Sequence, residues 1–120
     1  MKWILLLLTF PVAAASEADW VELYCNGEVE HALQDRTRVD CLTNTHAIEY
    51  DFARKWAEAV GQSLHYSVMT GQRAGIVLIL RTPADERHWK RLVNVIETHG
   101  LQIDAWPLRV YKLQEQAKTP

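Results

Sequence analysis

The sequence predicts one α/β domain, a small mixed-sheet sandwich in which helices pack on a central sheet. Residues 28–52 contain short stretches in which polar and apolar residues alternate, as they do in strands with one buried face. From Ala53 onward, apolar residues recur at the spacing of a helix. Residues 75–80 then form an unbroken apolar run, which is typical of a strand covered on both faces. This order predicts a hairpin that leads, through a right-handed crossover helix, into a parallel central strand.

An apolar leader precedes this domain. Lys2 is followed by an apolar run to Phe10, and small residues of the A-x-A kind end at Ala15, as in a cleavable secretory signal. The run is shorter than the roughly 20 residues that span a bilayer. We therefore expect a signal peptide over residues 1–15, with cleavage after Ala15 or after Ala18. The remaining chain would be periplasmic or secreted, without stable membrane association; an uncleaved N-terminal anchor is the alternative.

Length, charge and cysteine content bound the rest of the chain. The 120 residues suffice for one domain, which we expect over residues 19–112, with a polar tail over residues 113–120. With 48% hydrophobic residues and a net charge of −2, the composition excludes a disordered chain and a polybasic nucleic-acid binder. In an exported protein, Cys25 and Cys41 can form a structural disulfide or remain two buried thiols.

The elements follow one another without an internal repeat or a linker. After a short first element over residues 20–25, turn residues separate strands expected over residues 28–33, 38–43 and 47–52. Two helices are expected next, one from Ala53 to Gly71 and one from about residue 83 to Gly100, because apolar residues recur there at helical spacing. Two short edge strands, over residues 101–106 and 108–111, are expected to close the domain.

The hairpin formed by the second and third strands carries acidic side chains that suggest chemistry. If the strands pair symmetrically about their turn, Asp40 lies opposite Glu49 and Arg38 lies opposite Asp51. Side chains alternate along a strand, so these four residues would share one face. Opposed carboxylates need a proton or a cation, and oxygen ligands on neighbouring strands suit Mg²⁺ or Mn²⁺. The alternative is a solvated face that Arg38 neutralises.

A polar stripe on the following helix adds to this hypothesis. Lys55, Glu58, Gln62 and Tyr66 recur at intervals of three or four residues, starting close to the end of the strand that carries Asp51. Lys55 can stabilise negative charge on a phosphate, and Gln62 and Tyr66 can bind a phosphate oxygen or a base. The alternatives are a solvated helix face and a partly buried tyrosine.

Together these residues resemble the PD-(D/E)XK nuclease superfamily. The resemblance lies in residues 38–43, 47–58 and 61–66, and it covers roughly half of the chain. In that superfamily an αβββαβ core of the restriction-endonuclease-like fold carries an Asp on one strand and an acid-x-Lys on the next, which hold one or two divalent metal ions. The Gln-Ser-Leu-His-Tyr run that ends at Tyr66 is similar to the Gln-x-x-x-Tyr motif of the RecB-like branch.

The resemblance implies roles for individual residues. The implied metal ligands are Asp40 and Glu49, with Glu30 and Asp51 as further candidates. The implied substrate-side residues are Gln62, Tyr66 and Arg38. The position two after Glu49 is Asp51 where the superfamily has lysine, so Lys55 would serve as a relocated catalytic lysine. A chain that had lost catalysis would show the same departure.

Two classes of function follow from these observations. The first is metal-assisted hydrolysis of phosphodiester bonds in nucleic acid, with Mg²⁺ or Mn²⁺ as cofactor. The second is an exported, catalytically inactive binding module that kept the nuclease-like sandwich. Its exposed anchors would be Trp20, Trp89 and Trp106, unless these tryptophans are buried in the core. None of the five histidines shows H-x-x-x-H or H-E-x-x-H spacing, so we expect no zinc site.

Overall fold

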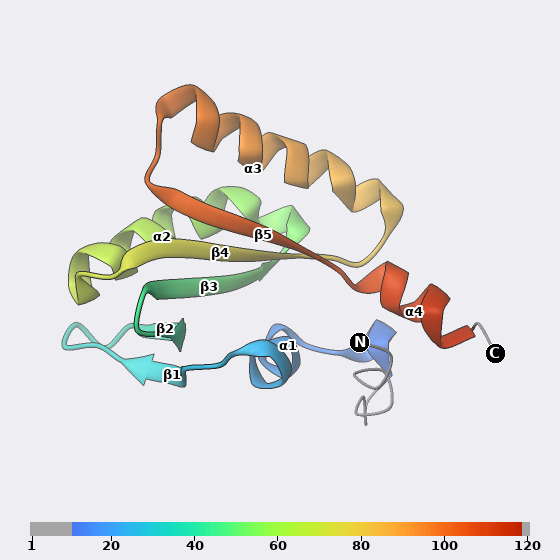
Figure 1. Cartoon of the computed structure of the whole chain (residues 1–120), viewed down its shortest axis with the longest axis horizontal. Helices are drawn as coiled ribbons and strands as arrows, with labels where there is room; N and C mark the ends of the chain where they lie inside the picture. The colour runs from blue at the N-terminus through green and yellow to red at the C-terminus, as the bar shows by residue number, and fades with distance from the viewer. Residues whose placement is uncertain (1–10, 119–120) are drawn as a thin grey trace.

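The computed structural model describes residues 11–118 (Figure 1). Residues 1–10, the greater part of the predicted signal peptide, lie outside the described residues. The main elements are α1 (Glu17–Tyr24), β1 (Glu28–Ala32), β2 (Arg38–Leu42), β3 (His46–Phe52), α2 (Trp56–Thr70), β4 (Arg73–Leu80), α3 (Glu86–His99), β5 (Ile103–Arg109) and α4 (Val110–Lys118). Short 3-10 turns precede α1, α2 and α3, at Val12–Ala14, Ala53–Lys55 and Pro83–Asp85.

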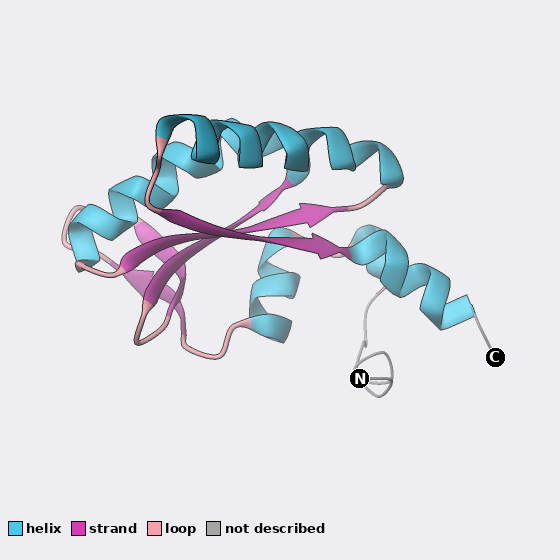
Figure 2. Ribbon diagram, turned by 45° about the horizontal axis from the view of Figure 1, so that its top comes forward, coloured by secondary structure: helices cyan, strands magenta, loops and turns pink. Residues whose placement is uncertain are grey.

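The strands form one five-stranded mixed sheet in the order β1-β2-β3-β4-β5. The first three strands are antiparallel neighbours, whereas β3, β4 and β5 run parallel through the crossover helices α2 and α3. Figure 2 shows α2 and α3 on one side of the sheet and α1 on the other. The predicted α/β class with a mixed sheet is therefore confirmed. None of the helices within residues 11–118 has the length and apolar character that crossing a membrane requires.

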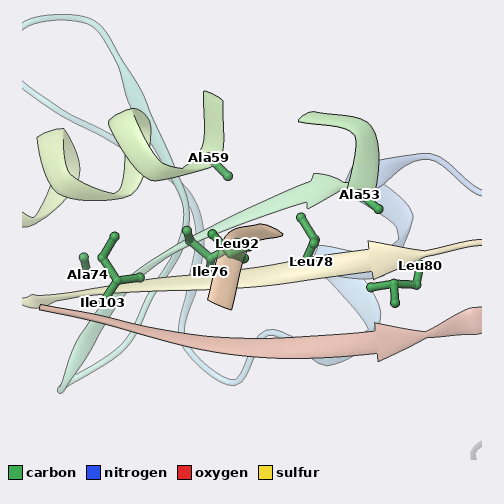
Figure 3. Packing of buried hydrophobic residues seen from close by; sticks show 8 residues of the cluster. All are labelled: Ala53, Ala59, Ala74, Ile76, Leu78, Leu80, Leu92 and Ile103. Carbon is green, nitrogen blue, oxygen red and sulfur yellow. The ribbon is translucent and has the colours of Figure 1, made fainter. Parts of the chain in front are cut away.

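The core forms on both faces of β4, whose residues alternate between two hydrophobic clusters. Ile76 and Leu78 pack with Leu92 of α3 on one face (Figure 3), and Ile79 packs with Trp20 of α1 on the other. All of these side chains are fully buried. Burial on both faces explains why β4 reads as a continuous apolar run.

The ends of the two long helices also follow from local sequence. Gly71 and Gly100 adopt left-handed backbone conformations, with φ angles of 74° and 60°, and each ends the helix before it. Glycine accepts this conformation without the steric cost that a Cβ brings. Before α3, Thr82 and Asp85 form a capping box around Pro83, which suits the first turn of a helix.

The last part of the chain differs from the prediction. Residues 103–109 form one strand that passes through Pro107, where two short strands were expected, and residues 110–118 form helix α4 in place of a strand end and a polar tail. β5 lies at the edge of the sheet, where a missing proline N–H costs no ladder bond. Val110 is buried against the cluster that contains Trp20, and this long-range packing stabilises α4.

Candidate functional site

The strands β2 and β3 pair as predicted near their turn and then separate. Cys41 pairs with Ile48 and Leu42 with Ala47, but the ladder does not continue to Asp40. The alternation along β2 is also interrupted there. Val39 packs on the α2 side of the sheet, whereas Cys41 packs with α1. Asp40 therefore lies at a local twist of the strand.

This twist leaves backbone N–H groups of β3 without a strand partner, and carboxylates take their place. Tyr50 N donates to Asp40 Oδ2 at 2.8 Å, and Phe52 N donates to Glu17 Oε2 at 3.0 Å. An unpaired buried N–H is costly, so both carboxylates stabilise the free edge of β3. Glu17 belongs to α1, and it brings that helix to the end of β3.

The side chains of Glu49 and Asp51 leave β3 on the face of the sheet that α2 covers, and both are buried. Their side chains are 5% and 4% exposed, and Glu49 Oε2 and Asp51 Oδ2 have no hydrogen-bond donor among the described residues. After burial, neighbouring carboxyls influence their pKa values: Asp40 and Asp51 act on Glu49, and Glu17 and Glu49 act on Asp51. We call Glu17, Asp40, Glu49 and Asp51 the carboxylate cluster.

Three carboxyls of the cluster, Asp40, Glu49 and Asp51, have raised pKa values, and burial is the main cause for all three. Burial raises the pKa of Asp40 to about 6 and that of Asp51 to about 7. The pKa of Glu49 lies furthest above its ordinary range, because burial and the charges of Asp40 and Asp51 act in the same direction. Without a bound cation, the cluster therefore keeps protons at neutral pH.

A lysine and a tyrosine from the following segments border the cluster. Lys55 Nζ lies 3.3 Å from Glu17 Oε2, and its charge offsets part of the rise that burial causes in the pKa of Asp51. Tyr66 of α2 is buried, and burial together with the charges of Glu49 and Asp40 raises its pKa to about 12. The predicted overlap of the helix with the acidic strand thus holds for Lys55 and Tyr66.

Three predicted residues lie elsewhere. The expectation that Arg38 shares a face with Asp51 is wrong, because the ladder ends before Arg38, whose side chain is exposed and lies 3.9 Å from Glu30. Glu30 has a φ of 55° and lies 3.9 Å from Arg38, and its charge contributes, after burial, to the raised pKa of Asp40. Gln62 is exposed on α2.

Sequence reasoning missed Glu17, because the domain was expected to begin at residue 19. The signal that marks it is local. Ser16 and Asp19 form a capping box, with Asp19 N donating to Ser16 Oγ at 3.2 Å and Ser16 N donating to Asp19 Oδ2 at 2.8 Å. A Ser-x-x-Asp spacing predicts a helix that begins at Glu17. Cleavage after Ala18 would remove this cap and Glu17 together.

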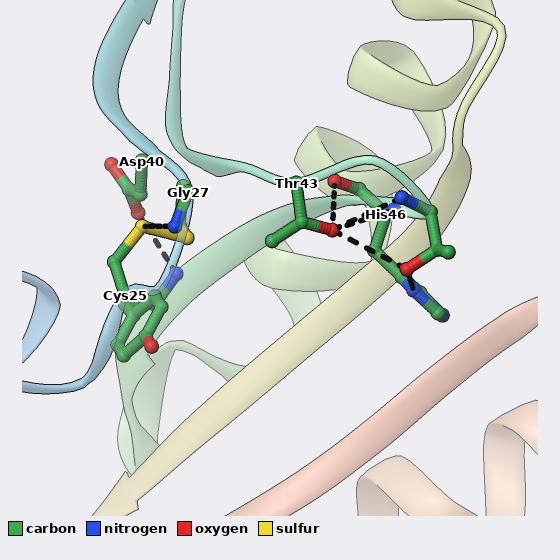
Figure 4. Close-up of a disulfide and its surroundings, with 8 residues drawn as sticks. Cys25, Gly27, Asp40, Thr43 and His46 are labelled. Carbon is green, nitrogen blue, oxygen red and sulfur yellow. Dashed lines mark hydrogen bonds between the residues drawn. A yellow bond between two sulfur atoms is a disulfide. The ribbon is translucent and has the colours of Figure 1, made fainter.

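A disulfide joins the end of α1 to β2 next to the cluster. Cys25 and Cys41 are bonded with their Cα atoms 5.8 Å apart, and Asp40 lies beside the bridge (Figure 4). Of the two alternatives for the cysteines, the structure therefore has the bridge. On the loop-entropy model, a bridge of this kind contributes about 3 kcal/mol to stability. It ties α1, and with it Glu17, to the strand that carries Asp40.

Residues 11–118 contain no group of three or more His, Cys, Asp or Glu side chains that is already spaced to hold a metal ion. Comparisons of the chain with models of protein families, with curated proteins and with solved structures gave no match.

Proposed function

We propose that the carboxylate cluster binds one divalent cation, Mg²⁺ or Mn²⁺, and that the protein hydrolyses phosphodiester bonds of nucleic acid. The observation that carries the proposal is the pair of buried oxygens without a donor, Glu49 Oε2 and Asp51 Oδ2. An ionised carboxylate buried without a partner is unfavourable by several kcal/mol, and a bound cation removes this cost. Carboxylate oxygens are also the ligands that Mg²⁺ and Mn²⁺ prefer. Asp40, Glu49 and Asp51 would hold the ion.

The order of the elements supports the same function. The succession α1-β1-β2-β3-α2-β4 matches the αβββαβ order of the restriction-endonuclease-like core that the sequence resemblance implies. Asp40 lies on β2, Glu49 on the adjacent β3 and Tyr66 on the helix that follows. If the chain has the nuclease-like core that the resemblance implies, these three residues are expected on these elements. We therefore propose a PD-(D/E)XK-like core, extended by α3, β5 and α4 and exported to the periplasm or the cell exterior.

The chain's own residues would position the substrate. A cation at this site supplies a bound water of lowered pKa and polarises the phosphate. Lys55 Nζ would donate to a phosphate oxygen after leaving Glu17, because the pair is only partly buried and exchanges readily. Tyr66 lies near the same carboxylates, and its hydroxyl would donate a hydrogen bond to a phosphate oxygen or a base of the substrate. Arg38, whose exposed side chain extends from the edge of the sheet, would contact the nucleic-acid backbone at a distance from the cluster.

A second candidate function is a non-catalytic binding module with the same fold. The observation that favours it is that the acids and the lysine already have structural partners. Asp40 and Glu17 accept backbone N–H groups of β3, and Lys55 is paired with Glu17. A chain without catalysis would keep these contacts because they stabilise the edge of β3.

The experiment combines cation binding with cleavage on the purified protein. Calorimetric titration with Mn²⁺ at pH 8 is expected to show one site, and incubation with plasmid and single-stranded DNA in Mg²⁺ or Mn²⁺ is expected to show cleavage. Glu49→Gln keeps the shape of the side chain and removes its charge, so it should abolish both. Glu58→Gln is the matched control, because Glu58 is an exposed acid on α2.

The outcomes separate the two candidates. Cation binding with cleavage, both lost in Glu49→Gln and kept in Glu58→Gln, supports the nuclease. Cation binding without cleavage of any nucleic acid supports the binding module. Absence of cation binding in the folded wild-type protein contradicts the metal site altogether.

A further inference from the structure

A hollow of about 810 Å³ lies on the opposite face of β3 from Glu49 and Asp51. Its lining includes His46 and Ile48, which alternate with the acidic positions along β3 and so point away from them. Trp106 of β5 forms one wall, and the loop after α1 and the turn between β2 and β3 form the rim. The volume falls within the roughly 300–1,000 Å³ of typical small-ligand sites. This hollow and the carboxylate cluster are therefore separate sites.

The aromatic wall of the hollow is held in place. The Trp106 ring is 41% exposed, and it meets the His46 ring edge-on at a centroid distance of 5.3 Å. Gly75 lies beneath both rings, since a Cβ there would come within 3.0 Å of Trp106 Cζ3. His46 Nε2 lies 2.7 Å from Asp104 Oδ2, and Arg73 holds Asp104 with two further hydrogen bonds. This network holds the His46 ring against one side of Trp106, and another part of the Trp106 ring lines the hollow.

The rim is rigid for a different reason. In the turn between β2 and β3, the Thr43 hydroxyl accepts hydrogen bonds from the backbone N–H groups of Thr45 and His46 (Figure 4). On the other side, the Cys25–Cys41 disulfide anchors the loop, and Gly27 N donates to Cys25 Sγ at 3.3 Å. A pre-formed site loses less conformational entropy when a ligand binds than a flexible one does.

The chemistry of the lining restricts the class of ligand. Hydroxyl and amide side chains dominate the polar lining: Asn26, Thr43, Asn44, Thr45 and Gln72. Each group can both donate and accept hydrogen bonds. The charged lining residue is Glu28, and no lysine or arginine of the described chain lines the hollow. A phosphate or carboxylate ligand normally requires such a cation, so an anionic ligand does not fit.

We propose that this hollow binds a neutral saccharide. The apolar face of a sugar ring would stack on Trp106, and its hydroxyls would hydrogen-bond to the amide and hydroxyl groups of the rim. A nucleobase can also stack on tryptophan, but a nucleotide carries a phosphate, and no lysine or arginine of the described residues lines the hollow to receive it. The proposal does not depend on the function proposed for the carboxylate cluster, since the two sites share no residue.

The test is calorimetric titration of the purified protein with cellobiose, maltose and N,N′-diacetylchitobiose, and with adenosine and AMP as comparators. At least one saccharide is expected to bind, and Trp106→Ala is expected to weaken it about tenfold, whereas Trp106→Phe keeps an aromatic ring and most of the affinity. Asn44→Ala, at an exposed position of the turn, should weaken binding about threefold by loss of one hydrogen bond. Val68→Ser is the control, since Val68 is an 81% exposed residue of α2 away from the hollow.

The proposal is overturned by either of two results. They are the absence of binding by all three saccharides, whether or not adenosine or AMP binds, and saccharide binding that is unchanged in both Trp106→Ala and Asn44→Ala. If Trp106→Ala does not fold, Asn44→Ala and a second rim variant, Asn26→Ala, decide the outcome, because both asparagines are exposed. Saccharide binding that persists in Glu49→Gln shows that the two sites act independently.

Discussion

The acidic residues of this domain occur in two opposite environments. Glu86, at the start of α3, accepts hydrogen bonds from Arg109 at 2.8 and 3.0 Å and from the Tyr111 hydroxyl at 2.7 Å. The Arg109 hydrogen bonds are the main cause that lowers its pKa to about 2. Glu49 and Asp51, by contrast, are surrounded by other carboxyls, and their pKa values are raised. The same domain therefore provides hydrogen-bond donors for Glu86, whereas Glu49 and Asp51 need a proton or a cation.

This contrast separates a structural acid from a candidate functional one. The Glu86 contacts tie α3 to the end of β5 and need nothing from outside the chain. Buried polar atoms without partners are uncommon in folded proteins, and they occur where a ligand, a water molecule or a strained site supplies the missing contact. The four predictions below test the contrast, from the largest expected effect to the smallest.

The first prediction concerns the pH dependence of stability without metal. Asp and Glu in an unfolded chain ionise near pH 4, whereas the folded pKa values are about 6 for Asp40 and about 7 for Asp51. Above pH 4 the folded protein therefore holds extra protons, and its free energy of unfolding falls as pH rises from about 4 to the folded pKa of each group, by about 1.4 kcal/mol per pH unit for each extra proton. Glu86 has a pKa of about 2 and acts in the opposite sense. Its ionised form stabilises the folded protein, and this stabilisation is lost as pH falls below about 4.

Calorimetric melting in EDTA between about pH 2 and pH 9, a range that includes the folded pKa values of Asp40, Asp51 and Glu86, measures this profile. We expect the maximum of stability at about pH 4, because the raised pKa values cost stability above it and the lowered pKa of Glu86 costs stability below it. Mn²⁺ added at pH 8 should restore part of the loss, by about 2.7 kcal/mol at a concentration of about 100 times Kd. A melting temperature that rises between pH 5 and pH 8 without metal would contradict the raised pKa values.

The second prediction is that Glu49→Gln stabilises the metal-free protein at pH 8. Glu49 has a pKa of about 10 in the folded protein, so at pH 8 it must take up a proton when the chain folds. Glutamine needs no proton, and its amide N–H₂ can donate to the neighbouring carboxyls, so we expect the free energy of unfolding to rise by about 2 kcal/mol. Denaturant unfolding of Glu49→Gln and of the control Glu58→Gln measures the difference. Destabilisation by Glu49→Gln would show that the carboxylate itself makes a necessary contact.

The third prediction tests the paired acid. Arg109→Ala removes the cation and leaves Glu86 with Tyr111 as its remaining donor, so we expect destabilisation by about 1 kcal/mol for this partly buried pair. The loss should shrink as pH falls toward the pKa of Glu86. Lys90→Ala, at an exposed position of α3, controls for loss of a surface cation. An equal effect of both substitutions would mean that the ion pair has no specific role.

The fourth prediction separates catalysis from stability at Lys55. Lys55 is paired with Glu17 of the carboxylate cluster, and both side chains are partly exposed. Lys55→Met is therefore expected to change the free energy of unfolding by less than about 0.5 kcal/mol. If the protein is a nuclease, cleavage should fall about 100-fold, as when one group that stabilises transition-state charge is removed. Arg54→Met, at the exposed neighbouring position, should leave cleavage unchanged.

Much of the fold was predictable because it depends on local pattern. The apolar run of β4, the change of period at Ala53 and the glycines that end α2 and α3 are all properties of adjacent residues. The register Leu42 with Ala47 also followed from the position of the turn. The closeness of Asp40, Glu49 and Asp51 came from the same short hairpin, which is why most of the candidate site could be proposed.

The rest depends on contacts between distant residues. Glu17 reaches Phe52 across 35 positions of the chain, and no periodicity within α1 specifies that partner. Val110 begins a helix rather than extending β5 because it packs with α1. Arg38 leaves the acidic face because β2 twists at Asp40, where the regular pairing ends. Strand alternation assumes an uninterrupted ladder, so it fails beyond such a point.

The sequence by itself determined the class of fold, the ends of the long helices and the presence of several acids on two neighbouring strands. Only the tertiary structure decided which of these acids are buried together, and that Trp20 is in the core while Trp106 is exposed beside a hollow. Burial and pKa depend on what covers a side chain from elsewhere in the chain. Here successive side chains of β3 leave opposite faces of the sheet, so Glu49 and Asp51 are buried toward α2, whereas His46 and Ile48 line the candidate saccharide site on the other face.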